Sequence, residues 1–324
     1  MAILITGATG FVGLAVSAYL LEAGEALILF GNQPPSDELL RLLPRDRYRI
    51  CIGDIREASD IERACGDDRI EAAIHLAAMT AGPAREAAAP EAISSVNVGG
   101  TIALMKTIDR HRPRRVLHLS SVAVYGIADA GPIGSYAAAR SCPRPASLYG
   151  ITKLAGEQVA LRLGELFGLD VRVVRLGAVF GPWEHQTNVR DAMNPHLQVV
   201  KTTEAGRTSL LPRAMLNDWI YVRDAAEGIV RVLGAADLGS EHIFDLGGGV
   251  STDLLEWGEA LKPYRPGLSC RVAAPGETPN VLYNLPHDRA PLDNDAIARA
   301  TGFHPRFDLA AAAKDYTAWL ERLS

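Results

Sequence analysis

The chain has 324 residues and a formal net charge of −5, with 48% hydrophobic and 22% charged residues. This length is enough for one large domain or two with a sizeable core, and the composition is ordinary for a globular protein. An acidic balance without a basic patch argues against nucleic acid as a partner.

Cysteine usage and apolar runs bear on where the protein works. The four cysteines are widely spaced and form no C-x-x-C pair, which predicts reduced thiols. They are Cys51, Cys65, Cys142 and Cys270. The apolar stretch at residues 2–5 is too short for a secretory signal, and no run approaches the roughly 20 residues that span a bilayer. We therefore expect a cytoplasmic protein without a membrane partner.

Short apolar runs alternate with helical patterns through the first half of the chain. Strands are predicted at residues 2–6, 26–30, 47–51, 72–77, 115–120 and 171–176. Helices are predicted at residues 11–23, 59–65, 94–110 and 148–166. This alternation is typical of right-handed βαβ units and a parallel sheet. The expected fold class is α/β, a doubly wound parallel sheet of the Rossmann type.

The pattern changes after Pro182. Residues 183–215 are polar and show no sustained period, and a proline-rich stretch runs from 263 to 286. Helices are predicted at 225–233, 254–261 and 309–323, with a strand at 243–246. We expect a Rossmann domain over residues 1–180. A smaller mixed α/β C-terminal subdomain is expected over 181–324, with some segments returning to the core.

A glycine-rich turn directly follows the first predicted strand. In T-G-A-T-G-F-V-G at residues 6–13, Gly7 permits a tight turn, Gly10 lets the backbone approach a pyrophosphate, and Gly13 lets helix and strand pack closely. The helix that begins at Phe11 and Val12 offers N–H groups and a positive dipole end to phosphates. The strand-turn-helix context predicts a dinucleotide site in the first domain.

The residue that normally distinguishes NAD from NADP is missing. A carboxylate at the end of the second strand usually holds the adenosine ribose 2′-hydroxyl. Gly31 occupies that place and is followed by Asn32 and Gln33. Without this carboxylate, the site no longer repels the 2′-phosphate of NADP. However, no arginine stands beside Gly31 to bind that phosphate. Asn32 or Gln33 is expected to bond the ribose. NAD and NADP both stay open, with NAD slightly favoured.

Further cofactor contacts are predicted where later strands end. Asp54 and Ile55 follow the third strand and would contact the adenine of the cofactor. The Asp54 carboxylate would accept a hydrogen bond from the exocyclic amine of the adenine. His75 is expected to be a packed strand histidine. The small residues Ala77 and Ala78 would let the cofactor lie close above the sheet.

Asn97 stands in a predicted helix, although asparagine is a poor helix former. We expect it to bridge that helix to the active-site strand, and we include it among the candidate cofactor-binding residues.

Tyr149 and Lys153 in Y-G-I-T-K lie one helical turn apart on one face. A nearby ammonium and a cofactor positive charge would lower the phenol pKa from about 10, so Tyr149 is the candidate acid/base. Ser120 and Ser121 end the fifth strand, at the sheet edge where ligands bind. Ser121 is preferred as the hydroxyl that polarises a substrate oxygen beside Tyr149.

Several further motifs follow in order along the chain. They are G-D-I-R at 53–56, H-L-A-A at 75–78, N-V-x-G-T at 97–101, L-S-S-V-A-V-Y-G at 119–126, R-L-G-A-V-F-G-P at 175–182, D-W-I-Y-V-R-D-A-A at 218–226 and F-D-L-G-G-G at 244–249. With the glycine turn and Y-G-I-T-K, the chain resembles an extended short-chain dehydrogenase/reductase of the NAD-dependent epimerase/dehydratase type, over roughly residues 1–250.

The resemblance implies a role for each catalytic candidate. Tyr149 would be the acid/base, Lys153 would bond the nicotinamide ribose and depress the Tyr149 pKa, and Ser121 would orient the substrate. Leu176 and Val179 would lie near the nicotinamide carboxamide, and Ser120 is counted among the cofactor contacts. The C-terminal part would bind substrate, and a homodimer packed through helices is the family habit.

Departures from the family pattern bear on the reaction. Dehydratases and sugar-acid decarboxylases of the family usually place an acid directly after the catalytic Ser or Thr, whereas Val122 and Ala123 follow Ser121 here. This disfavours 4,6-dehydration, which needs a general acid for the leaving hydroxyl. His185 and His196 lack metal-ligand spacing, so no metal is predicted. No G-x-S-x-G is present, which argues against a hydrolase.

Residues 183–215 do not match the segment that grips a nucleotide diphosphate in sugar-nucleotide epimerases. Five cations are candidate phosphate contacts, with solvated surface charge as the alternative for each. They are Arg190, Lys201, Arg207, Arg213 and Arg289. We take Arg213 and Arg289 as the candidate substrate-binding residues beside Ser121 and Tyr149.

Three function classes remain. The leading hypothesis is an NAD(P)-dependent sugar-nucleotide epimerase that acts through a transient keto intermediate. The alternative is an NAD(P)-dependent dehydrogenase or reductase of a smaller, non-nucleotide hydroxy or keto compound such as a sugar acid or polyol, which Gly31 and the unmatched region 183–215 favour. A cofactor-sensing or scaffold protein on this fold has no need of Ser121, Tyr149 and Lys153.

Overall fold

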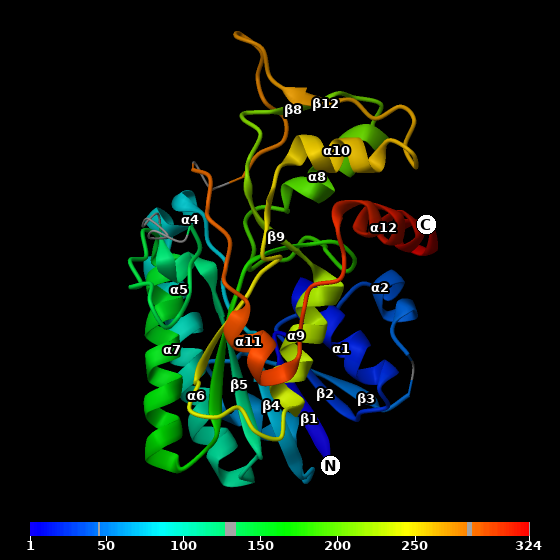
Figure 1. Cartoon of the computed structure of the whole chain (residues 1–324). Helices are drawn as coiled ribbons and strands as arrows, with labels where there is room; N and C mark the ends of the chain where they lie inside the picture. Colours follow the sequence, from blue (N-terminus) through cyan, green and yellow to red (C-terminus); the bar gives the residue numbers. More distant parts are fainter. Residues whose placement is uncertain (45, 127–133, 284–286, 324) are drawn as a thin grey trace.

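Parallel pairing of short apolar strands forms the centre of the computed structural model, which describes residues 1–44, 46–126, 134–283 and 287–323. The seven-stranded sheet has the order β10-β6-β5-β4-β1-β2-β3, and every neighbouring pair is parallel (Figure 1). Its strands are β1 (Ala2–Thr6), β2 (Leu27–Gly31), β3 (Tyr48–Ile52), β4 (Ile70–His75), β5 (Arg115–Ser121), β6 (Val171–Leu176) and β10 (Ile243–Leu246). The predicted doubly wound α/β fold is confirmed.

Helices cover both faces of this sheet. One face carries α1 (Phe11–Glu22) and α9 (Val222–Gly234), and the other carries α3 (Ala58–Cys65), α6 (Gly100–Ile108) and α7 (Leu148–Phe167). Successive strand residues point to opposite faces. Ile5 accordingly belongs to the buried cluster that includes Leu14 of α1, and Leu4 to the cluster that includes Leu104 of α6.

The helix predicted at residues 94–110 is wrong as a single element. The chain forms α5 (Pro90–Ser94), a π-helical turn at Ser95–Gly99, α6, and a 3-10 turn at Asp109–His111. Asn97 lies inside the π-helical turn, where its carboxamide takes part in hydrogen bonds to other segments. Such turns favour a side chain that is committed elsewhere, which the helical period of the sequence does not reveal.

The later part of the chain lies above the carboxyl ends of the sheet strands (Figure 1). It contains α8 (Pro195–Glu204), β8 (Ser209–Leu211), α10 (Leu254–Leu261), β12 (Cys270–Val272) and α12 (Leu309–Leu323). A three-stranded sheet of β7 (Ala178–Phe180), β9 (Asn217–Tyr221) and β11 (Ser251–Thr252) connects the two parts. Strand β10 pairs with β6 in the central sheet, and α9 packs against α1. The remaining short elements are α2 (Asp37–Leu42), α4 (Pro83–Ala88), α11 (Asp295–Thr301) and a 3-10 turn at Val122–Tyr125.

Residues 183–215 contain a helix and a strand, although their sequence shows no sustained period. Helix α8 begins with Asn194 as its cap and Pro195 in its first turn, a recognisable start signal. Its ring-bearing residue His196 is fully buried and stacks on Phe180, with ring centroids 4.0 Å apart. A polar-looking segment is therefore held by packing against β7. Of the proline-rich stretch, residues 284–286 lie outside the described residues.

A buried ion pair lies beneath the catalytic end of the sheet. Arg175 of β6 donates to Glu157 of α7 through Nη2 at 2.8 Å and through Nε at 3.0 Å. The two side chains are 3% and 0% exposed, respectively. Arg175 also donates to the Tyr125 hydroxyl at 3.0 Å, and Tyr125 donates to Asp245 of β10 at 2.8 Å. The network thus joins β6, α7 and β10.

Removing the cation from this network should be costly, because it leaves the Glu157 charge buried and unpaired. We expect Arg175→Met to lower the free energy of unfolding by about 3–5 kcal/mol, measured by urea denaturation. Arg162→Met breaks the exposed Arg162–Glu165 pair of the same α7 and should cost under about 1 kcal/mol. Equal losses in the two variants would contradict the structural role of the buried pair.

Candidate active site

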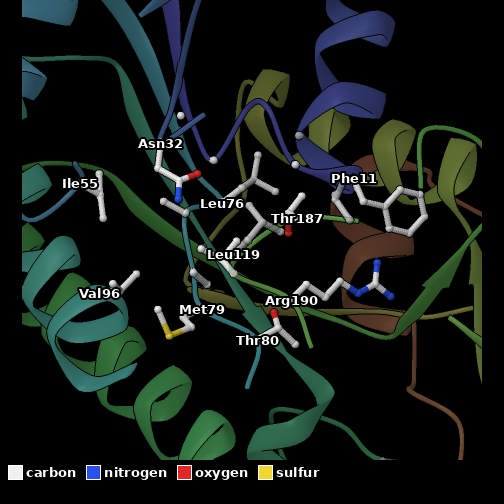
Figure 2. A pocket seen from close by; sticks show the side chains of 18 of the residues that line it. Phe11, Asn32, Ile55, Leu76, Met79, Thr80, Val96, Leu119, Thr187 and Arg190 are labelled. Atoms are coloured by element: carbon white, nitrogen blue, oxygen red, sulfur yellow. The ribbon is translucent and has the colours of Figure 1, made fainter. Parts of the chain in front are cut away.

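A cavity of about 520 Å³ opens at the carboxyl edge of the sheet (Figure 2). It gathers nearly all the residues that the sequence assigned to cofactor and catalysis. These lining residues are Gly7, Gly10, Phe11, Val12, Gly13, Asn32, Asp54, Ile55, Ala77, Ala78, Ser120, Ser121, Tyr149, Lys153, Leu176 and Val179. The cavity therefore brings together residues from the segments that follow β1, β2, β3 and β4 and from α1, β5, α7, β6 and β7.

The floor of the cavity fits a dinucleotide. Gly7 has a φ of +70°, and a Cβ there would lie 2.6 Å from the backbone nitrogen of Ala77, so the turn needs glycine. Among the described residues no side chain caps the N-terminus of α1, which enters the cavity at Phe11 and Val12. Helix N–H groups and dipole are thus available to a phosphate.

Tyr149 lies in the first turn of α7 and meets two hydroxyl groups. The hydroxyl groups of Ser121 and Thr80 are polar neighbours of its phenol and favour its charged form. Ser121 caps the following 3-10 turn by accepting from the backbone N–H of Ala123 at 3.1 Å. One turn further along α7, the ammonium of Lys153 donates to the carbonyl of Leu119 in a short hydrogen bond. The predicted triad of Ser121, Tyr149 and Lys153 is therefore gathered at one end of the cavity.

The expected lowering of the Tyr149 pKa does not occur in the protein alone. Burial raises the pKa of the phenol, because the charged form loses its hydration. The hydroxyl groups of Ser121 and Thr80 and the charge on Arg190 act in the opposite direction but do not outweigh burial. Lys153 is not among the groups that lower it in this structure, and its ammonium is directed at Leu119.

Burial also acts on Lys153. It lowers the pKa of the ammonium to about 8, and the charge of Glu157 opposes that shift. The side chain is only 5% exposed. A lysine with this pKa changes its charge close to neutral pH.

The two strand-end serines have different surroundings. Ser120 is 5% exposed, and its hydroxyl donates to Glu157 in a short hydrogen bond. Ser121 points to the other side of the strand, toward Tyr149, as alternation along β5 requires. The geometry agrees with the choice of Ser121 over Ser120. The hydroxyl of Ser120 is committed to Glu157, although the residue lines the cavity.

Asn97 does not line the cavity. It is 3% exposed, accepts from the Met79 N–H at 2.7 Å and donates to Thr152 of α7 at 2.9 Å. The bridge that we expected runs to the loop after β4 and to α7. A direct contact of Asn97 with cofactor stays a prediction, and its position favours an indirect one.

Asp54 and His75, at the ends of β3 and β4, both have partners within the protein. Nε of Arg56 donates to both carboxylate oxygens of Asp54, at 2.9 and 3.0 Å, so this carboxylate already has a partner. His75 is 2% exposed and bonded to Thr6 at 2.7 Å, as a packed strand histidine should be. Neither observation tests the adenine contact.

The candidate phosphate-binding cations are dispersed. Arg190 lines the cavity, with its guanidinium 3.0 Å from Glu184 and 5.5 Å from the centre of the Phe11 ring. Lys201 and Arg207 are exposed, and Arg213 is paired with Asp288. Arg289 does not line the cavity, but it is half-buried.

Sequence reasoning missed several lining residues. Residues 187–190 cross the cavity, Thr80 flanks the catalytic phenol, and Met79 and Val96 supply apolar surface. Figure 2 shows Thr187 and Arg190 on this segment, opposite Leu76 and Leu119. Thr80 follows the carboxyl end of β4, which is a usable signal. Residues 187–190 carry no motif that would have placed them there.

The described residues lack two kinds of feature. No helix there is long and apolar enough to cross a membrane. No cluster of histidine, cysteine, aspartate and glutamate in the same ranges is arranged to hold a metal ion.

Comparison with known proteins gives the family. The model of the NAD dependent epimerase/dehydratase family matches residues 3–247. The chain belongs to this family. Its members include both epimerases and dehydratases, so membership makes the protein an enzyme of this group and leaves its reaction to be argued.

Relatives of the family align along much of the chain. The dTDP-glucose 4,6-dehydratase of Streptomyces griseus is 28% identical, covering 99% of this chain and 94% of that protein. The dTDP-L-rhamnose 4-epimerase of Burkholderia thailandensis is 28% identical, covering 78% of each. UDP-glucuronate 4-epimerase 6 of Arabidopsis thaliana is 27% identical, covering 73% of this chain and 52% of that protein. The match thus spans about half the length of the plant relative.

Solved structures of the family share the fold. The UDP-glucose 4-epimerase of Thermotoga maritima with UDP-glucose superposes with a TM-score of 0.82 at 22% identity, covering 99% of both chains. The UDP-glucuronic acid 4-epimerase of Bacillus cereus with NAD gives 0.77 at 22% identity, covering 100% of this chain and 99% of that one.

The low pKa of Lys153 makes stability depend on pH. Its pKa is about 8 in the folded protein and 10.5 in the unfolded chain, so the unfolded chain holds more protons between these values and stability rises with pH. Relative to Lys153→Met, the wild type should gain about 2 kcal/mol of unfolding free energy between pH 7.5 and 9.5.

Urea denaturation at several pH values measures this difference. Lys106→Met, at an exposed lysine of α6, gives the baseline. If the wild-type and Lys153→Met curves run parallel with pH, the ammonium is not shifted by burial.

Proposed function

We propose that the protein is an NAD-dependent epimerase that acts on a sugar nucleotide through a transient keto intermediate. The observation that carries this proposal is the contact of Tyr149 with Ser121 at the end of a glycine-turn cavity. The relatives named above act, by their names, on dTDP- and UDP-linked sugars, which favours the same class of substrate here.

Tyr149, Ser121 and Lys153 have different roles in the proposed reaction. A nicotinamide cofactor, when bound, takes a hydride from a carbinol carbon and returns it. Tyr149 accepts the carbinol proton and later gives it back at the same oxygen. Ser121 holds that oxygen through its hydroxyl, and Lys153 supplies a positive charge at the cofactor side of the phenol. Return of hydride to the opposite face inverts the carbon.

The turn after Ser121 argues against dehydration. Val122 is 4% exposed and packs in the core cluster around Tyr125, and Ala123 follows it. Elimination of a sugar hydroxyl needs an acid at this point to protonate the leaving oxygen. An aliphatic side chain cannot do so. Redox chemistry without elimination is therefore favoured, despite the similarity to a 4,6-dehydratase.

Arg289 is the better of the two proposed substrate contacts. It is half-buried, burial lowers its pKa, and within the described chain its guanidinium has no carboxylate or hydrogen-bond partner. The charges of Arg289 and Arg190 both act to lower the pKa of Tyr283, although burial raises it overall. Arg213, in contrast, is paired with Asp288. A desolvated, unpaired guanidinium suits a diphosphate.

The remaining expectations are proposals too. We propose residues 1–180 as the cofactor domain and 181–324 as mainly substrate-binding, with a cytoplasmic location and a homodimeric assembly. Exposed apolar side chains on α6 and α7, Ile102, Ile151 and Leu166, support a helix-mediated contact between two copies.

The test separates inversion from net oxidation. Purified protein is given a panel of UDP- and dTDP-sugars and, separately, free sugar acids and polyols. Sugar inversion without net absorbance change at about 340 nm is expected for a nucleotide-linked sugar, because the hydride returns to the substrate. Stoichiometric reduction of NAD by a free sugar derivative would favour a dehydrogenase and refute the epimerase assignment.

Tyr149→Phe is the control for this assay. It removes the proton acceptor and leaves the ring in place, so turnover should fall by roughly two to four orders of magnitude while cofactor affinity stays within about twofold. Retained turnover would refute the role of the phenol.

Arg289→Ala tests the diphosphate contact. Loss of a charge-assisted bond of about 1.5–3 kcal/mol should raise KM for the nucleotide-linked substrate by roughly 10- to 100-fold, with a smaller effect on cofactor binding. Arg213→Ala, at a neighbouring arginine that already has a carboxylate partner, is the matched comparison. A larger effect of Arg213→Ala would reverse the assignment.

A further inference from the structure

The end of β2 has no room for the missing acid. A Cβ added at Gly31 would lie 2.2 Å from the hydroxyl oxygen of Thr9 and 2.7 Å from its methyl carbon. Thr9 belongs to the glycine turn and is 5% exposed, so it cannot easily move away. A carboxylate at position 31 is therefore excluded by packing, and ribose recognition must come from other residues.

Two asparagines from distant parts of the chain meet at this place. Asn32 donates through Nδ2 to Oδ1 of Asn188 at 3.1 Å, across 156 positions in sequence. Both residues line the cavity. Within the described chain, Oδ1 of Asn32 and Nδ2 of Asn188 have no other partner. The pair thus offers one acceptor and one donor side by side, which is what a hydroxyl group needs.

Asn188 belongs to a segment, residues 187–191, that we call the clasp. The C-terminal end of the clasp is bound to the segment that follows β4. There, Asp191 accepts from Arg85 Nε at 2.6 Å and from Gly82 N–H at 2.8 Å. Thr80 N–H donates to the carbonyl of Val189 at 2.8 Å. The clasp therefore crosses the cavity from the end of β2 to the start of α4, with Arg190 beside Phe11 (Figure 2).

We propose that Asn32 and Asn188 together bind the adenosine ribose hydroxyls and select NAD over NADP. This rests on the proposed function only in requiring a dinucleotide cofactor. The place of the ribose follows from the general rule for the end of the second strand in this fold. A carboxamide pair replaces the usual carboxylate.

The charges around the pair agree with NAD selection. A 2′-phosphate would need a cation beside Asn32. Arg56 also lines the cavity, but its guanidinium is forked to Asp54. The amide oxygen of Asn32 would face the phosphate oxygens with no hydrogen to offer. A ribose hydroxyl, which both donates and accepts, satisfies the pair.

Asn188→Ala tests the proposal on cofactor-stripped full-length protein. We expect NAD to bind roughly three- to tenfold more weakly by calorimetry and to dissociate faster by stopped flow, because one or two hydrogen bonds are lost. NADP affinity should change less than twofold, so selectivity falls. Asn32→Ala should have the same effect, and the double variant should add little.

Gln186→Ala is the matched control, since this exposed amide lies next to the clasp but does not line the cavity. NAD affinity and release within twofold of wild type in Asn188→Ala would overturn the proposal. An equal loss of affinity for NAD and NADP would also overturn the proposal. The asparagine pair would then hold the clasp in place without distinguishing the two riboses. Loss of NAD selectivity in a protein that inverts no sugar would support this inference and refute the proposed function alone.

Discussion

The buried carboxylate of Glu157 holds the catalytic edge of the sheet in register. It accepts from Ser120 on β5 and from Arg175 on β6, and its charge opposes the loss of the proton from Lys153. A charge with no exposure must be fully paired, since an unpaired one costs several kcal/mol. This requirement fixes α7 against two strands, and α7 carries both Tyr149 and Lys153. The position of the chemistry thus depends on an ion pair that takes no part in it.

Local patterns in the sequence were sufficient for the core of the site. All six predicted strands of the first half are present, with ends displaced by at most two residues. The different surroundings of Ser120 and Ser121 also follow from the sequence, because alternation along a strand sends neighbours to opposite faces. The catalytic role of Ser121 stays a prediction. Such features depend on a few adjacent residues and on the general geometry of parallel sheets, so they can be read without the fold.

Other features depend on contacts between distant segments and escaped prediction. The bond between Asn32 and Asn188 joins residues 156 positions apart, and neither belongs to a motif that indicates the other. At the π-helical turn, the carboxamide of Asn97 is bound to Met79 and Thr152, which are 18 and 55 positions away in the sequence. The effect of burial on Tyr149 also required the fold, since the sequence shows the neighbouring charge but not the lost hydration.

Thr80 has a double attachment with a mechanical consequence. Its backbone N–H donates to the carbonyl of Val189 in the clasp, and its hydroxyl is a polar neighbour of the Tyr149 phenol. A clasp that lifts away therefore pulls on the same residue that steadies the acid/base. A shift of the clasp is therefore transmitted to a side chain that flanks the acid/base. The cofactor cavity and the proton-transfer group share one support.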